Sequence, residues 1–263
     1  MIKYSAENSA GEIPVARDDS NGRDITMRPE LHADEVHVWL ADLNNYAADK
    51  LKLLLSADEL SRAARFHFDK DRNYFIVARG LLRRILATYL DIPAGELRFI
   101  YAEKGKPSLE ESQRNSLNFN LAHSHGMAIY GFSRNREVGV DLEFLREDLA
   151  DEKIAERFFS PSEIHVLKGL PANLRKQAFF DCWTRKEAYI KARGEGLSMS
   201  LDEFDVSLQP GEAAALLRNH KEPAEVRRWS MQSLNVPAGF VAALVVEGHD
   251  WKVRAFTVDQ IPG

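Results

Sequence analysis

Residues 56–86, SADELSRAARFHFDKDRNYFIVARGLLRRIL, and residues 160–190, SPSEIHVLKGLPANLRKQAFFDCWTRKEAYI, read as two copies of one helical unit. Each copy opens with a serine three residues before a glutamate, which is the capping-box spacing of a helix start: Ser56 with Glu59 and Ser160 with Glu163. Both segments then run on into an amphipathic stretch. The sequence therefore predicts a short capped helix followed by a longer helix, twice.

Strand-like segments flank both copies. EVHVWLADL (35–43) precedes the first copy and VGVDLEFL (138–145) the second, and each is followed later by a further apolar run, HGMAIYGFS (125–133) and AGFVAALVVEG (238–248). Helices that alternate with short strands in each half predict an α+β fold of two similar α/β halves, a pseudo-dimeric duplication. The active site is expected in the cleft between the halves. Chance similarity of two helical segments is the alternative.

Three parts are expected along the chain. Residues 1–30 are polar and predict a poorly ordered N-terminal extension. Residues 31–136 are expected to form the N-terminal half with the first repeat. Residues 137–263 are expected to form the C-terminal half with the second repeat and a metal-binding signature.

Composition excludes several classes. The net charge of −5 argues against a general nucleic-acid binder. No apolar run is long enough for a membrane span, and the N-terminus has no signal-peptide core. Cys182 is the only cysteine, which excludes an intrachain disulfide and favours a reducing compartment, so a cytoplasmic protein is expected. One segment is locally basic and indicates an anionic partner: Arg62, Arg65, Lys70, Arg72, Arg79, Arg83 and Arg84.

Carboxylates gather at the second copy. Asp141 and Glu143 lie two residues apart in a predicted strand and so share a face. Glu187 and Lys191 share a face of the predicted helix. Three carboxylates that converge, with oxygen donors only, suit a hard cation such as Mg²⁺. The alternatives are a solvated strand face and a surface Glu–Lys ion pair.

Phosphate-binding side chains would complete such a site, because Mg²⁺ held by few carboxylates takes further oxygens from phosphate. FNLAHSHGM (119–127) supplies His123 and Ser124, and EKGKPSL (103–109) supplies Lys104 and Lys106 about a glycine. A polar hairpin loop and a solvated lysine turn are the alternatives.

Several of these segments resemble a known family. GVDLE (139–143), RFFSPSE (157–163) and WTRKEAYIK (183–191) resemble, in that order, the signature blocks of 4′-phosphopantetheinyl transferases. The longer, pseudo-duplicated Sfp-type branch is matched by three more blocks: GKP (105–107), FNLAHS (119–124) and GEGLS (194–198). The resemblance runs from about residue 35 to about residue 246.

The resemblance implies transfer of the phosphopantetheine arm of coenzyme A to a serine of an apo acyl, peptidyl or aryl carrier protein, with release of 3′,5′-ADP. It implies Mg²⁺ at Asp141, Glu143 and Glu187, and Lys191 beside the leaving phosphate. Glu187 or a metal-bound water is implied as the base for the carrier serine. The residues that it implies as coenzyme A contacts are Arg62, Lys106, His123, Ser124 and Lys186.

The resemblance also implies partners, and two rival functions remain beside it. The implied partners are carrier domains of fatty-acid, polyketide or nonribosomal peptide synthases, and the duplication favours a monomer. Two departures are expected to weaken the phosphate grip, Ala122 in place of a serine and Glu59 in place of a basic residue. The alternatives are a non-catalytic module that binds carrier protein or coenzyme A, and a metal-dependent phosphoesterase.

Overall fold

The structure, a computed structural model, describes residues 29–103, 105–146, 152–194, 196 and 199–260. The expected N-terminal extension, residues 1–30, therefore lies outside the described residues except for its last two positions. Lys104 and most of GEGLS (194–198) also lie outside them. None of the helices in the described ranges is both long and apolar enough to cross a membrane.

The N-terminal half begins with the strand that precedes the first repeat, and the repeat itself forms the predicted short and long helices. Its elements are β1 (Glu35–Asp42), α1 (Ala48–Lys52), α2 (Ala57–Ala63), α3 (Asp69–Leu90), β2 (Phe99–Tyr101), β3 (Pro107–Leu109), α4 (Glu111–Arg114), β4 (Leu117–Ser124) and β5 (Met127–Arg134).

The C-terminal half repeats this order around the second copy, and its long helix has 22 residues, as α3 has. Its elements are β6 (Val138–Phe144), α5 (Glu152–Phe158), α6 (Pro161–Gly169), α7 (Ala172–Arg193), β7 (Phe204–Val206), β8 (Leu216–Asn219), α8 (Glu225–Arg228), β9 (Trp229–Leu234), β10 (Phe240–Glu247) and β11 (Lys252–Thr257).

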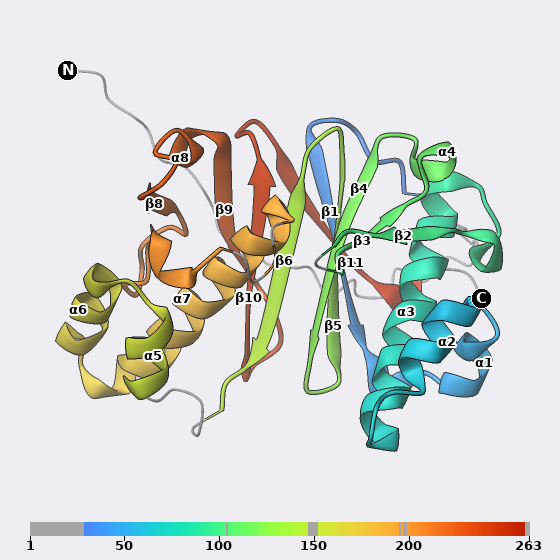
Figure 1. Cartoon of the computed structure of the whole chain (residues 1–263), viewed down its shortest axis with the longest axis horizontal. Helices are drawn as coiled ribbons and strands as arrows, with labels where there is room; N and C mark the ends of the chain where they lie inside the picture. Colours follow the sequence, from blue (N-terminus) through green and yellow to red (C-terminus); the bar gives the residue numbers. More distant parts are fainter. Residues whose placement is uncertain (1–28, 104, 147–151, 195, 197–198, 261–263) are drawn as a thin grey trace, which may run out of the picture.

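The two large sheets confirm the α+β fold of two similar halves. In the first, the strand order is β11-β1-β5-β4, and in the second it is β6-β10-β9. Because β1 corresponds to β6 and β5 to β10, both sheets have the same antiparallel core. They lie side by side at the centre of the molecule, with α7 to one side and α3 to the other (Figure 1).

The last strand corrects the expected boundary of the halves. β11 pairs in parallel with β1, from Glu35 opposite Lys252 to Leu40 opposite Thr257. Phe256 of β11 stacks on Trp39, with ring centroids 4.6 Å apart. The C-terminal half was expected to span residues 137–263. Its last strand, β11, instead crosses back and belongs to the N-terminal sheet.

The three largest apolar cores of the described residues hold the two halves together. α3 packs on the first sheet through residues such as Leu81 and Leu82, and α7 packs on the second through residues such as Phe180 and Tyr189. A third core joins the two sheets and takes side chains from both halves: Val36, Val38, Ile129, Val138, Val140, Leu142 and Leu244 among others. Burial of this third core fixes β4 next to β6.

Both predicted capping boxes are present. The backbone N–H of Ser56 donates to Glu59 at 3.0 Å, and that of Ser160 donates to Glu163 at 2.9 Å. Both glutamates are buried. A buried carboxylate requires a partner, and each finds a cation on the following long helix, so the capping boxes lock α2 onto α3 and α6 onto α7.

A buried histidine makes the stability of the N-terminal sheet depend on pH. His37 of β1 contacts the Tyr89 hydroxyl at 2.8 Å and Glu35 at 3.2 Å, with Arg254 of β11 close to the same glutamate. Burial lowers the pKa of His37 from 6.5 to about 4. The unfolded chain therefore binds more protons than the folded chain between these values. The free energy of unfolding should fall by about 3 kcal/mol as the pH drops through this window.

Urea unfolding measured from pH 7 to pH 4 tests this expectation. The slope attributed to His37 should disappear in His37→Gln and persist in His165→Gln, which removes an exposed histidine of α6. Equal pH slopes in wild type and His37→Gln would contradict it.

Candidate active site

Four polar side chains of the second repeat converge from β6 and α7. Asp141 and Glu143 alternate with Val140 and Leu142 on β6, so the carboxylates face α7 and the apolar residues enter the core between the sheets. Glu187 and Lys191 lie one turn apart on α7. The structure thus brings together the side chains that the sequence predicts as a site.

Asp141 is the centre of this group. It is 5% exposed, and its Oδ1 accepts a hydrogen bond from the Lys191 ammonium at 2.6 Å. Its second oxygen, Oδ2, is buried and has no hydrogen-bond partner. A buried carboxylate oxygen without a donor is costly, so this atom marks a position where a cation or donor would be stabilising.

Burial and the negative charge of Asp141 affect both Glu143 and Glu187. Burial, and then the charge of Asp141, raise the pKa of Glu143, although its Oε2 accepts a hydrogen bond from Ser124 at 3.0 Å. Burial and Asp141 likewise raise the pKa of Glu187, and Lys191 opposes them. The carboxylates therefore repel one another, and a positive charge between them would relieve that repulsion.

The residues present fit a hard divalent cation. All donors are carboxylate oxygens, the ligands that Mg²⁺ prefers, and one of them is an orphaned buried atom. Among the described residues, no group of three or more His, Cys, Asp or Glu side chains is arranged so that it could hold a metal ion without rearrangement. Lys191 itself takes one oxygen of Asp141, so cation binding would have to share or displace that contact.

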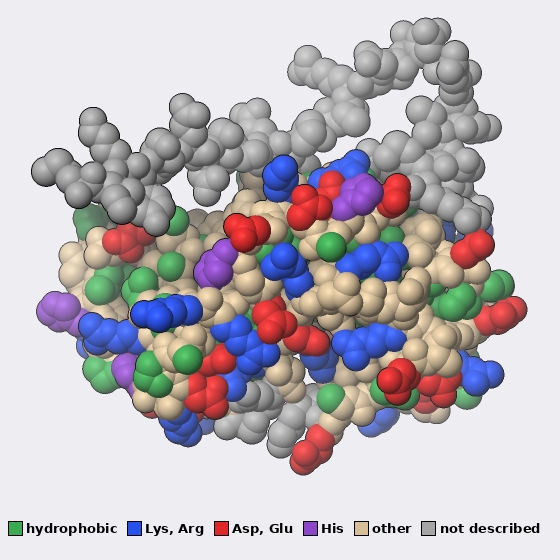
Figure 2. All heavy atoms as spheres, turned by 90° about the horizontal axis from the view of Figure 1, so that it is seen from above, with side chains coloured by type: hydrophobic (Ala, Val, Ile, Leu, Met, Phe, Trp, Pro, Cys, Tyr) green, Lys and Arg blue, Asp and Glu red, His purple; other side chains and the backbone are tan. Residues whose placement is uncertain are grey.

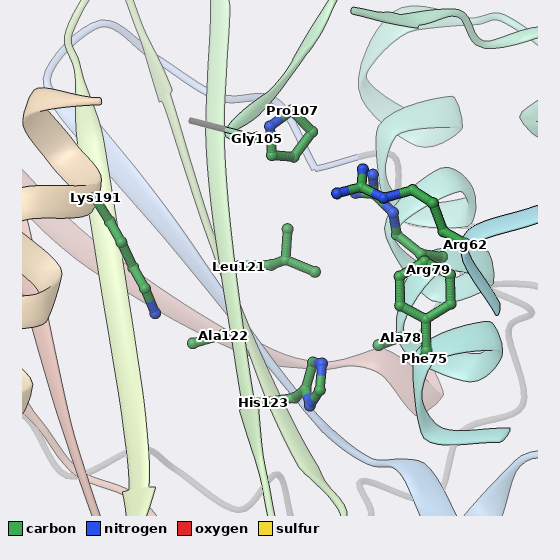
Figure 3. A pocket seen from close by; sticks show the side chains of 10 residues that line it. All are labelled: Arg62, Phe75, Ala78, Arg79, Gly105, Pro107, Leu121, Ala122, His123 and Lys191. Carbon is green, nitrogen blue, oxygen red and sulfur yellow. The ribbon is translucent and has the colours of Figure 1, made fainter. Parts of the chain in front are cut away.

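A cavity of about 310 Å³ lies between the halves beside this group. Lys191 reaches toward it from α7, His123 stands on β4, and Arg62 and Arg79 lie on the opposite wall (Figure 3). The surrounding walls desolvate His123, and this effect, with the nearby Lys191 ammonium, lowers its pKa. Arg62, Arg79 and Lys191 supply positive charge to the cavity, which suits a ligand with several phosphates.

Two other predicted contacts lie at the edges of the cavity. Lys106 donates to Glu137 at 3.1 Å and to the Ala192 carbonyl at 3.2 Å, so it bridges the β2–β3 turn and the end of α7. Ser124 donates to Glu143 and accepts from the Phe144 N–H at 3.3 Å. Ser124 thus orients a carboxylate of the site.

Lys186 is the predicted contact that the structure does not bring to the cavity. Its side chain is fully buried on the other side of α7, where the ammonium pairs with Glu163 at 2.8 Å and donates to the Leu201 and Phe204 carbonyls. No phosphate could reach it without breaking this buried pair. The prediction of Lys186 as a coenzyme A contact is therefore corrected to a structural role.

The basic segment is also divided by burial. Arg79 and Arg83 are buried and pair with Glu59, so they are not part of an exposed basic surface. Glu59 faces these arginines and does not line the cavity, and it need not weaken a phosphate grip there. Among described residues on the face shown in Figure 2, basic and acidic side chains are interspersed.

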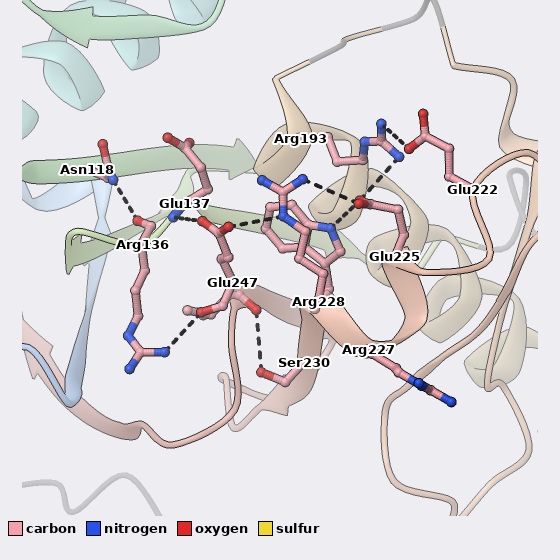
Figure 4. Close-up of polar contacts among 12 residues, drawn as sticks. Asn118, Arg136, Glu137, Arg193, Glu222, Glu225, Arg227, Arg228, Ser230 and Glu247 are labelled. Carbon is pink, nitrogen blue, oxygen red and sulfur yellow. Dashed lines mark hydrogen bonds and ion pairs between the residues drawn. The ribbon is translucent and has the colours of Figure 1, made fainter.

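Charged side chains hold the end of α7 in place (Figure 4). Arg193 pairs with Glu222 at 2.9 Å and with Glu225 at 3.3 Å, and Arg228 links Glu225 to Glu247. Arg193 follows Lys191 by two residues. This network therefore limits the movement of the α7 turn that carries the site lysine.

Sequence reasoning missed Arg79 as part of the cavity wall, and Tyr101 as the residue that contacts both arginines of that wall. Arg62 stacks over the Tyr101 ring at 4.4 Å, and Arg79 donates to the Tyr101 hydroxyl at 2.8 Å. Arg79 carried a signal, its place in the basic segment. Tyr101 carried none, because the strand that holds it has only three residues.

Comparisons with known proteins identify the family of the chain. Residues 137–245 match the family described as "4'-phosphopantetheinyl transferase superfamily", and residues 43–131 match "4'-phosphopantetheinyl transferase, N-terminal". The 4′-phosphopantetheinyl transferase HetI of a Nostoc species is 40% identical over 227 residues, which cover 85% of this chain and 92% of that protein.

Two further relatives come from Bacillus. A 4′-phosphopantetheinyl transferase of Bacillus pumilus is 35% identical over 185 residues, covering 70% of this chain and 77% of that protein. The 4′-phosphopantetheinyl transferase Sfp of Bacillus subtilis is 26% identical over 184 residues, covering 70% and 80%. The chain therefore belongs to the 4′-phosphopantetheinyl transferase superfamily, in its Sfp-type branch.

Proposed function

We propose that the protein transfers the 4′-phosphopantetheine arm of coenzyme A to a serine of an apo carrier protein, with Mg²⁺, and releases 3′,5′-ADP. The observation that carries this proposal is Asp141, with one oxygen on Lys191 and the other buried without a partner, at the edge of a cation-lined cavity. A cation held at Asp141, together with the arginine and lysine side chains that line the cavity, would neutralise the charge of a diphosphate.

The reaction requires one bond to form and one to break. The serine oxygen attacks the phosphorus that carries the pantetheine arm, and the bond from this phosphorus to the oxygen of the adenosine phosphate breaks. Bound Mg²⁺ would be held by Asp141, Glu143 and Glu187, and would stabilise the charge on the diphosphate.

Side chains of the site would accept the proton of the carrier serine and donate a proton to the departing phosphate. Glu187, or a water held by the cation, would accept the serine proton, because either would lie within reach of a hydroxyl that attacks the diphosphate. The Lys191 ammonium, which pairs with Asp141 and lines the cavity, would stabilise, and then protonate, the departing phosphate oxygen. Ser124 holds Glu143 in position, while Arg62, Lys106 and His123 bind the nucleotide phosphates.

Intact-mass measurement of apo carrier proteins tests the proposal. Fatty-acid, polyketide and nonribosomal peptide carriers are each incubated with the protein, coenzyme A and Mg²⁺, with and without EDTA. We expect a gain of one phosphopantetheine mass that EDTA prevents. Coenzyme A binding without any mass gain would indicate a non-catalytic module. Hydrolysis of coenzyme A without a carrier would indicate a phosphoesterase.

The duplicated fold also bears on assembly and location. Because the second half supplies the face that a symmetric partner would otherwise supply, we infer that the protein works as a monomer, and a sedimentation mass of twice the chain would contradict this. The single, buried Cys182 is compatible with a reducing compartment, and we infer a cytoplasmic protein.

A further inference from the structure

Two of the three site carboxylates have one oxygen already held by a neighbouring donor. Oδ1 of Asp141 accepts a hydrogen bond from the Lys191 ammonium at 2.6 Å, and Oε2 of Glu143 accepts one from the Ser124 hydroxyl at 3.0 Å. Lys191 belongs to α7 and Ser124 to β4, so the two donors come from different elements that pack against β6. Each carboxylate therefore has its other oxygen left for a further partner.

Both donors are held in place. The Asp141 side chain is 6% exposed, and separating a buried carboxylate from its ammonium is costly, so the pair with Lys191 should persist when a cation binds. The free oxygen of Asp141, Oδ2, is buried without a hydrogen-bond partner. Ser124 also accepts from the Phe144 N–H at 3.3 Å, which ties its hydroxyl to the backbone of β6. An ammonium has three N–H donors, so Lys191 can keep Asp141 and still reach into the cavity (Figure 3).

The number of oxygens that a carboxylate offers matters for the choice of cation. Ca²⁺ is large, takes about six to eight oxygens and often binds both oxygens of one carboxylate, whereas Mg²⁺ requires an octahedral shell and keeps several waters. A carboxylate with one oxygen on a donor can give only the other to a metal. We propose that Lys191 and Ser124 restrict Asp141 and Glu143 to one oxygen each and so select Mg²⁺ over Ca²⁺. This inference rests on the cation site of the proposed function.

Displacement of bound Mn²⁺ by Mg²⁺ or by Ca²⁺, followed by electron paramagnetic resonance in the protein without coenzyme A, tests this inference. Lys191→Met removes the ammonium, so it should raise the affinity for Ca²⁺ relative to Mg²⁺ by about 10-fold. Loss of a positive charge strengthens the binding of both divalent cations alike, and the ratio of the two affinities removes that effect. Ser124→Ala should shift the ratio in the same direction by about 3-fold.

Lys106→Met is the matched control. It also removes an ammonium at the end of α7, but this ammonium contacts Glu137 and the Ala192 carbonyl and holds no oxygen of Asp141 or Glu143. The ratio of Ca²⁺ to Mg²⁺ affinity should therefore stay at the wild-type value.

Equal ratios in wild type and Lys191→Met would overturn the inference. A crystal structure of the wild-type protein with Mn²⁺ decides the question if Lys191→Met does not fold. We expect Oδ2 of Asp141 on the metal and Oδ1 still on Lys191, and both oxygens on the metal would overturn the inference. Absence of Mn²⁺ binding to wild type would refute the metal site as well. These readouts do not depend on turnover, so a protein that selects Mg²⁺ through Lys191 and modifies no carrier would support the inference and refute the proposed transfer.

Discussion

Asp141→Asn and Glu187→Gln should each lower the rate of phosphopantetheine transfer by about 10²- to 10³-fold. Both changes keep the size of the side chain and remove a negative charge from the group that is proposed to hold Mg²⁺ against the diphosphate. Asp141 also loses its ion pair with Lys191, which is 2.6 Å long. Turnover is measured by the intact mass of a carrier protein across a range of Mg²⁺ concentrations.

Binding measurements separate a catalytic effect from a structural one. Coenzyme A affinity measured without metal should change little in either variant, because neither carboxylate is among the proposed nucleotide contacts, Arg62, Lys106 and His123. Glu156→Gln, on the exposed face of α5 where Glu156 pairs with Lys168, is the matched control and should retain wild-type turnover. Wild-type rates in Asp141→Asn would remove the central residue from the proposed site.

Gly139→Ala should produce the largest loss of stability among single-methyl additions to β6. A Cβ at this position would lie 2.1 Å from the Ala188 carbonyl oxygen and 2.4 Å from the Ala192 N atom, both in the backbone of α7. Neither atom can turn aside as a side chain could, so β6 and α7 must separate. We expect a loss of about 3 kcal/mol or more in the free energy of unfolding.

The same separation would move Asp141 away from Glu187 and Lys191, so turnover should fall together with stability. Urea unfolding and the carrier assay measure the two effects. Gly95→Ala is the matched control, since nothing lies within 4 Å of a Cβ built there. A Gly139→Ala protein as stable as wild type would show that β6 and α7 can adjust at no cost.

The local signals of the sequence predicted most of the secondary structure. The serine–glutamate pairs of the two capping boxes and the alternation of VGVDLEFL act over a few residues, so they can be read directly. β11 could not be predicted as part of the first sheet. Its place depends on pairing with β1, and on the Phe256 stack on Trp39, across more than 200 residues of chain.

The site shows the same division. Asp141 with Glu143, and Glu187 with Lys191, were predicted from strand and helix periodicity, which puts each pair on one face. Lys186 was misplaced because adjacent helix positions point in different directions. Glu187 faces β6, and Lys186 faces the buried Glu163. The segment WTRKEAYIK (183–191) contains both residues, but its sequence alone does not indicate which of them faces the site.

The sequence by itself predicted the duplication, the short and long helices with two flanking strands in each half, and the residue types of the proposed magnesium-and-phosphate site, because short-range spacing encodes all three. Only the tertiary structure decided that Asp141 keeps one buried oxygen without a partner, that Arg79 lines the cavity, and that a Cβ at Gly139 would meet the backbone of α7. The reason is physical. Burial, ion pairing and close backbone approach depend on segments that meet only when the two halves pack together.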